Sequence, residues 1–238
     1  MKIRIAYVEE PPFYWTNAEG RATGADIELA QVVLRAAGAT SVEPVATTFE
    51  QLLPGVRDGR WDMNVPIFVT AERARQVAFS EPVWTMVDGL LVHRGNPKAL
   101  ASYAAVARRA DARLGVIPGQ VQFQAARAAG VGDAQFVAFE DQPEALAALR
   151  AGRIDAFTGT ALGARALAQA SPELEVVTLA GDGAPPIGAF SLRQDDARWM
   201  AAVNAQLRNY LGSSDHRARM ARYGFSSAEI DGVVASSA

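Results

Sequence analysis

Residues 52–62 read LLPGVRDGRWD, and residues 146–155 read LAALRAGRID. Both stretches have apolar residues at helical spacing followed by the pattern R-x-G-R-x-D, in which the glycine is typical of a helix C-terminus. A helix, a glycine and a strand occur in any α/β protein, so this much alone is weak evidence of a repeat. The shared arginine and aspartate exceed what a helix end requires. The repeat therefore predicts two similar halves.

Working outward from this repeat, short β-rich runs alternate with helical patterns along most of the chain. Residues 3–8 predict a first strand, and residues 26–37 predict a helix that ends at Gly38. Further strand and helix patterns follow at 42–58 and 114–130, and the residues from Asp195 onward read as two helices. Such alternation is typical of α/β units on largely parallel sheets.

The two halves predict two lobes that the chain enters and leaves by separate connections. GLLVHRG at 89–95 would lead into the second lobe, and PIGAFSLR at 186–193 would lead back. We therefore expect residues 1–91 and 191–238 to form the first lobe and residues 92–190 the second. A ligand cleft between the lobes is the expected consequence.

Composition excludes several classes of function. The 238 residues carry a formal net charge of −3 with 23 Lys and Arg, which is too little basic charge for nucleic-acid binding. The chain has no cysteine and two histidines, so neither disulfides nor a cysteine or histidine-rich metal site is expected. No apolar run is long enough to span a membrane, and no signal peptide precedes the first strand, so an exported protein would have lost its signal.

Common catalytic and cofactor motifs are also missing from the sequence. No G-x-G-x-x-G follows a strand, and neither a phosphate-binding loop, an H-E-x-x-H nor a G-x-S-x-G is present. We therefore expect no catalytic residues, no metal and no cofactor.

The stretch PIFVTAERARQVAFSEP, residues 66–82, carries the strongest functional signal. Thr70 is a natural helix N-cap, which places Arg73 in the first turn of the following helix. An arginine beside free helix amides is a receptor for a carboxylate or a phosphate, because its planar fork matches two oxygens. The alternative is a surface arginine paired with Glu72 or Glu81.

The same stretch resembles the extracellular solute-binding proteins of polar amino-acid ABC importers, through the pattern D-x₇-T-x-E-R-x₃-V-x-F-S-x-P from Asp62 to Pro82. The resemblance extends over nearly the whole chain, including IRIAYVEEPPF, GADIELAQVVLRAAG, LGVIPGQ and GAFSL. Within this family the sequence is most similar to ectoine- and hydroxyectoine-binding proteins, through EEPPF, HRGNPKAL and RAGRIDAFTGTAL.

This resemblance implies a two-lobed periplasmic-binding-protein-like fold of type II, with two hinge strands and a cleft that closes on a zwitterionic solute. It implies that Arg73 grips the ligand carboxylate, assisted by backbone groups near Pro66 to Phe68 and at Gln120 and Val121. It also implies a monomer that delivers its solute to the membrane permease of an ABC importer, in the periplasm or outside the cell.

The departures from the family pattern concern the cationic end of the ligand. Relatives that bind α-amino acids usually present an acid at the position of Thr160, and a small polar residue near Phe68. Losing a point acceptor while gaining an aromatic surface favours a delocalised or methylated cation. Phe13, Phe68 and Phe49 would form an aromatic box, with Glu10 as a counter-charge.

The predicted ligand-binding residues are thus Glu10, Phe13, Phe49, Pro66, Phe68, Arg73, Gln120, Val121 and Thr160. Ectoine, a betaine and an ordinary amino acid remain open as ligands. Two other functions remain open too: the sensor domain of a membrane receptor, and a cyclohexadienyl dehydratase in which Glu10 serves as general acid.

Overall fold

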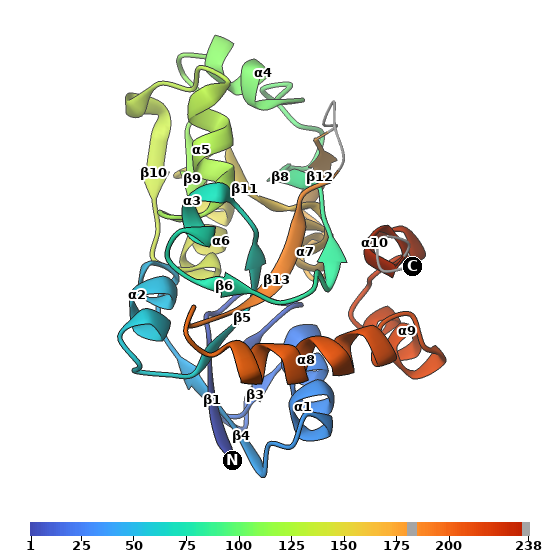
Figure 1. Cartoon of the computed structure of the whole chain (residues 1–238). Coiled ribbons are helices and arrows are strands. Elements are labelled where there is room, and N and C mark those ends of the chain that lie inside the picture. The colour runs from blue at the N-terminus through green and yellow to red at the C-terminus, as the bar shows by residue number, and fades with distance from the viewer. Residues whose placement is uncertain (180–184, 235–238) are drawn as a thin grey trace. The chain divides into compact units, whose positions relative to one another are not determined.

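The computed structural model describes residues 1–179 and 185–234 (Figure 1). The chain forms two compact units, Met1–Met86 with Pro185–Ala238, and Val87–Ala184. These boundaries lie a few residues before the 91/92 and 190/191 boundaries expected from sequence, which stay predictions. Residues 180–184 of the expected second lobe and 235–238 of the first lie outside the described part of the chain.

The first unit is built on a mixed sheet in the order β4-β1-β5-β13-β6, with β7 also paired to β13. β1 (Lys2–Tyr7) pairs in parallel with β4 (Ser41–Ala46) and β5 (Met63–Phe68). β13 (Ile187–Leu192) runs antiparallel to β5, β6 (Ala78–Phe79) and β7 (Trp84–Thr85). A small hairpin of β2 (Trp15–Thr16) and β3 (Ala22–Thr23) follows β1.

The helices of the first unit are α1 (Ala25–Ala36), α2 (Leu52–Arg57) after the 3₁₀ turn Phe49–Gln51, α3 (Ala71–Ala74), α8 (Ala197–Tyr210), α9 (Ser214–Ala221) and α10 (Ser227–Val234). The expectation of two helices after Asp195 is therefore wrong, because Ser227–Val234 forms a third whose Ile230 and Val233 are buried. Among the described residues, no helix combines the length and the apolar character needed to cross a membrane.

The second unit has a sheet in the order β10-β9-β11-β8-β12. β9 (Leu114–Val116), β10 (Phe136–Ala138) and β11 (Ala156–Thr160) are parallel, whereas β8 (Asp88–His93) is antiparallel to β11 and to β12 (Leu174–Thr178). Its helices are α4 (Tyr103–Arg108), α5 (Val121–Ala128), α6 (Gln142–Arg150) and α7 (Ala161–Gln169), with a 3₁₀ turn at Asp133–Gln135.

The sequence repeat occupies equivalent places in the two sheets. The first copy is α2 followed by β5, and the second is α6 followed by β11. In each unit this strand lies between a parallel neighbour and an antiparallel one. Gly59 and Gly152 end the two helices with φ of 73° and 67°, a left-handed conformation that favours glycine.

The aspartate shared by the two copies makes the same backbone contacts in both units. The amide of Arg4 donates to Asp62 Oδ2 at 2.7 Å, and the amide of Arg113 donates to Asp155 Oδ2 at 2.8 Å. In return, the Asp62 and Asp155 amides donate to the carbonyls of Arg4 and Arg113. The carboxylate thus fixes where the strand after the helix meets its parallel neighbour.

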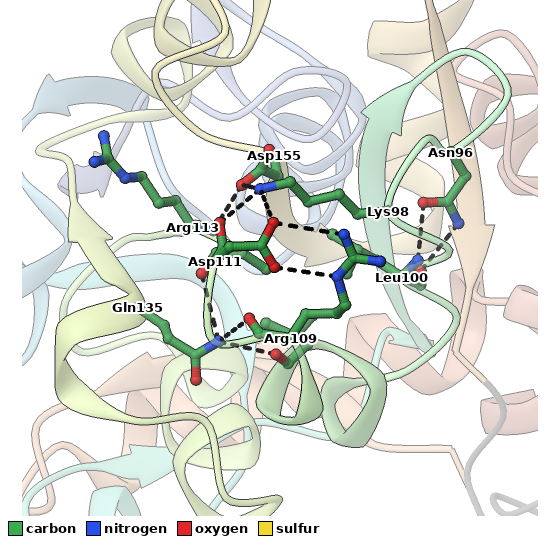
Figure 2. A network of polar contacts seen from close by, with 10 residues as sticks. Asn96, Lys98, Leu100, Arg109, Asp111, Arg113, Gln135 and Asp155 are labelled. Atoms are coloured by element: carbon green, nitrogen blue, oxygen red, sulfur yellow. Dashed lines mark hydrogen bonds and ion pairs between the residues drawn. The ribbon is translucent and has the colours of Figure 1, made fainter.

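Each aspartate is also paired with a cation. Arg4 Nη2 lies 3.0 Å from Asp62 Oδ1, and Lys98 Nζ lies 2.9 Å from Asp155 Oδ2. Figure 2 shows how Lys98 also reaches Asp111, so that the network joins the segment after β8 to the loop before β9. The network therefore holds three connections of the second unit together.

We predict that Asp155→Ala destabilises the protein by about 1–2 kcal/mol, because it removes the acceptor of the Arg113 amide and leaves Lys98 with a weaker partner. The midpoint of urea unfolding measures this change. Asp133→Ala is the matched control, since Asp133 makes a surface ion pair with Arg127 in the same unit and such pairs contribute little. Equal midpoints for the two variants would contradict the role of Asp155.

Candidate functional site

The loop after β1 is held in place by the start of α1. The amides of Phe13 and Tyr14 donate to the Glu10 carbonyl, which makes a tight turn. Ala25 and Asp26, in the first turn of α1, donate their amides to the carbonyls of Pro12 and Phe13 at 3.0 and 2.9 Å. The first amides of a helix have no acceptor within the helix, and here they hold the aromatic loop by donating to its carbonyls.

Gly24 makes this approach possible. Its φ is +124°, and a Cβ atom there would lie 2.3 Å from the Phe13 carbonyl oxygen. Any side chain at this position would push the loop away from α1. The glycine of the GADIEL stretch is therefore required by the loop and not only by the helix.

Five aromatic rings form one cluster in the first unit. Trp84 joins Phe13 and Phe68, with its ring centroid 5.9 Å from that of Phe13 and 5.3 Å from that of Phe68. Phe13 also contacts Tyr14 at 6.1 Å and Phe225 at 5.8 Å. The structure thus brings Phe13 and Phe68 to the same tryptophan, and Phe13 is packed on several sides, with 2% of its surface exposed.

A second glycine, Gly188, leaves room for the Trp84 ring of this cluster. Gly188 of β13 pairs with Trp84 of β7, and a Cβ at Gly188 would lie 2.1 Å from the indole ring. The indole therefore lies flat on the glycine backbone. Its Nε1 donates to the carboxylate of Asp26 at 3.2 Å, so the ring is fixed by packing and by a hydrogen bond.

Arg73 is buried at the start of α3, beside Phe68 and Phe49. Its Nη1 donates to the Phe68 carbonyl at 2.7 Å, and its guanidinium carbon lies 5.4 Å from the centroid of the Phe49 ring. Thr70 caps the helix by accepting the Arg73 amide at 3.1 Å, as the sequence predicts. Burial lowers the pKa of Arg73 to about 10, because desolvation disfavours the charged form of the guanidinium.

Two buried carboxyl groups lie close to these aromatic rings. Burial raises the pKa of Glu10 to about 7, although the Tyr14 hydroxyl donates to it at 3.4 Å. Burial also raises the pKa of Asp26 well above its usual value. Glu10 therefore changes its charge near neutral pH, and a cation placed beside it would stabilise the ionised form.

Pro66 lies in β5 where the pairing with β13 is irregular. The register shifts between Ala189 and Ser191, which pair with Ile67 and Asn64. Proline has no N–H to donate to the ladder, and this explains why the irregularity falls beside it. Pro66 is buried, and the shift leaves Phe68 in register with Gly188.

The three remaining predicted residues belong to the second unit. Gln120 is the buried N-cap residue of α5, and Val121 is its first residue. Thr160 ends β11 and caps α7 by accepting the amide of Gly163 at 3.0 Å. The oxygen of Thr160 thus already has a structural task, at the position where the resemblance leads us to expect an acid in relatives that bind α-amino acids.

The sequence reasoning missed six residues near the predicted ones. These are Tyr14, Asp26 and Trp84 in the first unit, and Asp88, Tyr103 and Gln122 in the second. Tyr14 directly follows Phe13 in sequence, so the prediction of Phe13 already pointed to this part of the loop. The others come together only through sheet pairing and helix packing.

Residues 3–226 match the family model of the bacterial extracellular solute-binding proteins, family 3. A probable amino-acid ABC transporter periplasmic-binding protein, y4tE of Sinorhizobium fredii (strain NBRC 101917 / NGR234), is 29% identical over 234 residues, which are 94% of this chain and 77% of that protein.

Solved structures agree with this match. EhuB in complex with hydroxyectoine is 28% identical, covers 98% of this chain and 94% of its own, and superposes with a TM-score of 0.86. An ancestral amino-acid-binding protein, AncCDT-1, described as a precursor of cyclohexadienyl dehydratase, is 26% identical, with a TM-score of 0.82 and coverage of 93% and 94%. The fold is that of type II periplasmic binding proteins, as the sequence predicts.

Gly24→Ala tests whether α1 positions the aromatic loop. We predict a loss of about 2–4 kcal/mol in stability, because the new Cβ combines an unfavourable φ with a backbone clash, and a change in near-ultraviolet circular dichroism from the displaced rings. Gly38→Ala is the control: its φ is +104°, but a Cβ there meets nothing within 4 Å. Equal losses in both variants would mean that only the backbone angle matters.

Proposed function

Because this chain belongs to the bacterial extracellular solute-binding proteins of family 3, we propose that it binds a small zwitterionic solute whose carboxylate is held by Arg73. Solute binding for import by an ABC transporter is the general role that the family match and the curated relative support. The observation that carries the proposal is a desolvated guanidinium bordered by an aromatic ring and a backbone carbonyl.

Burial gives Arg73 its strength as a carboxylate receptor. A guanidinium removed from water keeps its charge but loses hydration, and a bidentate carboxylate restores both charge balance and hydrogen bonds. The neighbouring Phe68 carbonyl and Phe49 ring orient the side chain in advance. Less ordering is then required when the ligand binds.

The cationic end of the solute is proposed to be delocalised or methylated. Phe13, Phe49 and Phe68 supply aromatic surface in the first unit, and Glu10 supplies a counter-charge when ionised. The second unit is proposed to contribute Gln120, Val121 and Thr160, and the first also Pro66. Ectoine, hydroxyectoine and betaine-like compounds have this combination of charges, and the similarity to EhuB with bound hydroxyectoine supports the choice.

The biological setting is proposed from the same relationship. Its small-molecule ligand would pass to the membrane permease of an ABC importer, and the protein would act as a monomer in the periplasm or outside the cell.

One observation favours an enzymatic alternative. Glu10 has a pKa of about 7, which suits a general acid, and the similar AncCDT-1 is described as a precursor of a dehydratase. Formation of product from prephenate or arogenate would support this alternative over binding alone.

Replacing Arg73 by Ala should weaken binding of the solute by about 2–5 kcal/mol, because the ligand carboxylate loses its partner in a desolvated site. Lysine should restore only part of the affinity, since it lacks the planar fork. Calorimetry with ectoine as titrant measures both effects. Arg75→Ala, an exposed arginine two residues away, should bind like the parent. Full affinity in Arg73→Ala would refute the assignment.

Phe68→Leu should cost about 0.5–2 kcal/mol in affinity for a delocalised or methylated cation, because leucine keeps apolar bulk but lacks the ring quadrupole. In the parent protein, ectoine or glycine betaine should bind more tightly than any common L-amino acid. A calorimetric panel tests both statements. Tight binding of an ordinary amino acid, with Phe68→Leu unchanged, would show that the ring serves only in packing.

The affinity for a ligand with a cationic end should fall as the pH drops below about 7, by up to about tenfold for each pH unit. The raised pKa of Glu10 means that its carboxyl loses its charge in this range, while Arg73 stays protonated. Tyr14 and Asp26 are titratable groups that also face Glu10. Glu10→Gln should flatten the profile, and Glu9→Gln should keep it. A ligand whose own charge is constant from pH 5.5 to 8 is required. An unchanged slope in Glu10→Gln would exclude Glu10 as the counter-charge.

A further inference from the structure

Asp88 lies at the sheet edge where this fold class binds ligands, although it begins its strand. β9, β10 and β11 are parallel, so their carboxyl ends lie at one edge of the sheet of the second unit (Figure 1). Because β8 runs antiparallel to β11, its first residue, Asp88, lies directly opposite Thr160, the last residue of β11. Open α/β sheets bind ligands outside the carboxyl ends of their parallel strands.

Directly opposed residues in an antiparallel pair place their side chains on the same face of the sheet, with Cβ atoms about 5 Å apart. Asp88 therefore stands beside Thr160, the position at which the resemblance leads us to expect an acid in relatives that bind α-amino acids. The oxygen of Thr160 accepts the Gly163 amide at 3.0 Å. The residue that lies opposite Thr160 on the neighbouring strand is thus an acid.

The Asp88 carboxylate is held in a fixed orientation by two neutral donors. Gln122 Nε2, in the first turn of α5, donates to Oδ1 at 2.8 Å, and the Tyr103 hydroxyl of α4 donates to Oδ2 at 3.0 Å. The Tyr103 oxygen lies 2.6 Å from Thr158 Oγ1, which comes from β11. Side chains from α4 and α5 thus contact the acid directly, and Thr158 of β11 is linked to it through Tyr103.

No cation balances this charge within the second unit. Both donors are neutral, and in the described part of the chain no Lys, Arg or His forms an ion pair with Asp88 or counteracts the burial that raises its pKa. Residues 180–184 and 235–238 contain none of these side chains. A partly buried carboxylate without a cation is unfavourable, and the missing partner is most simply a ligand.

We propose that Asp88 accepts a hydrogen bond from the cationic end of the transported solute, and that this end carries at least one N–H group. This inference rests on the proposed function and sharpens it. The two carboxylate oxygens offer about four lone-pair positions, and Gln122 and Tyr103 use two of them. A directional acceptor remains for one N–H donor.

The chemistry of the acceptor separates two ligand classes. An amidinium, as in ectoine, spreads its positive charge over an N–C–N group that can stack on an aromatic ring, and it also presents N–H groups. A quaternary ammonium, as in glycine betaine, presents only methyl groups and gains nothing directional from Asp88. Asp88 therefore favours an amidinium over a quaternary ammonium. Aromatic rings alone attract both kinds of cation and do not distinguish them in this way.

The competing explanation is that Asp88 only braces β8 against α4 and α5. A brace, when weakened, would lower affinity for every ligand to a similar degree, whereas an acceptor affects only ligands with N–H groups. Asp88→Asn keeps the size of the side chain and one oxygen, so it removes charge with little loss of packing. Glu140→Gln, an exposed acid of the same unit, controls for the change in net charge.

Calorimetry with ectoine and with glycine betaine tests the inference on the parent and both variants. Asp88→Asn should weaken ectoine binding by about 30-fold or more and alter betaine binding by less than about threefold, while Glu140→Gln should alter neither. In the double variant Asp88→Asn, Thr160→Asp, the relocated carboxylate should restore part of the ectoine affinity, since aspartate also serves as an N-cap. Unchanged ectoine binding, or equal losses for both ligands, would overturn the inference.

A measurement on the unaltered protein covers the case in which Asp88→Asn does not fold. The side-chain carboxyl ¹³C resonance of Asp88, assigned through the backbone of residues 87–89, should shift when ectoine saturates the protein, and should titrate at lower pH in the complex. No shift would overturn the inference. If binding depends on Arg73 but the Asp88 resonance does not respond to the ligand, only this inference is contradicted. If the parent protein binds no zwitterion at all, the proposed function is contradicted as well.

Discussion

In each unit, the carboxylate of an aspartate accepts the amide of a residue at the beginning of the neighbouring parallel strand. Asp62 does this for Arg4 and Asp155 for Arg113, and each pair also exchanges a backbone hydrogen bond in the other direction. A shift of one residue in a strand would turn every side chain to the opposite face. These two contacts therefore set which side chains reach the functional edge of each sheet.

From that register follows the environment of Arg73. β5 ends at Phe68, whose carbonyl receives the guanidinium and whose ring packs on Trp84. Trp84 in turn requires Gly188 beneath it and contacts Phe13 in the loop held by α1. The desolvated arginine is thus the end of a chain of packing contacts, and the proposed binding of a ligand carboxylate would depend on their rigidity.

The two units handle charge differently. The first buries a cation together with the acids Glu10 and Asp26, and it places aromatic rings around them. The second holds the partly buried carboxylate of Asp88 with neutral donors. The buried charges thus differ between the units: a cation with two acids in the first, and an acid with neutral donors in the second.

The sequence alone determined the fold class, the repeat, the Thr70 cap and the placement of Arg73 in a first turn, because these follow from local periodicity, helix-end chemistry and motif spacing. It also identified Phe13, Phe68 and Glu10 as a group, although it did not reveal that Phe13 packs against Phe225 near the other end of the chain. The sequence did not predict the third C-terminal helix, Ser227–Val234, because its apolar pattern extends over only eight residues.

Only the tertiary structure decided which residues are neighbours of Thr160 and Trp84. Asp88 is the first residue of a strand, whereas ligand-binding groups in open α/β sheets are expected after the last residue of a strand. The antiparallel course of β8 reverses that rule and brings its first residue to the carboxyl edge. Likewise, Gly188 and Asp26 are far apart in sequence, yet both fix Trp84, because strand pairing and helix packing join segments that no local pattern connects.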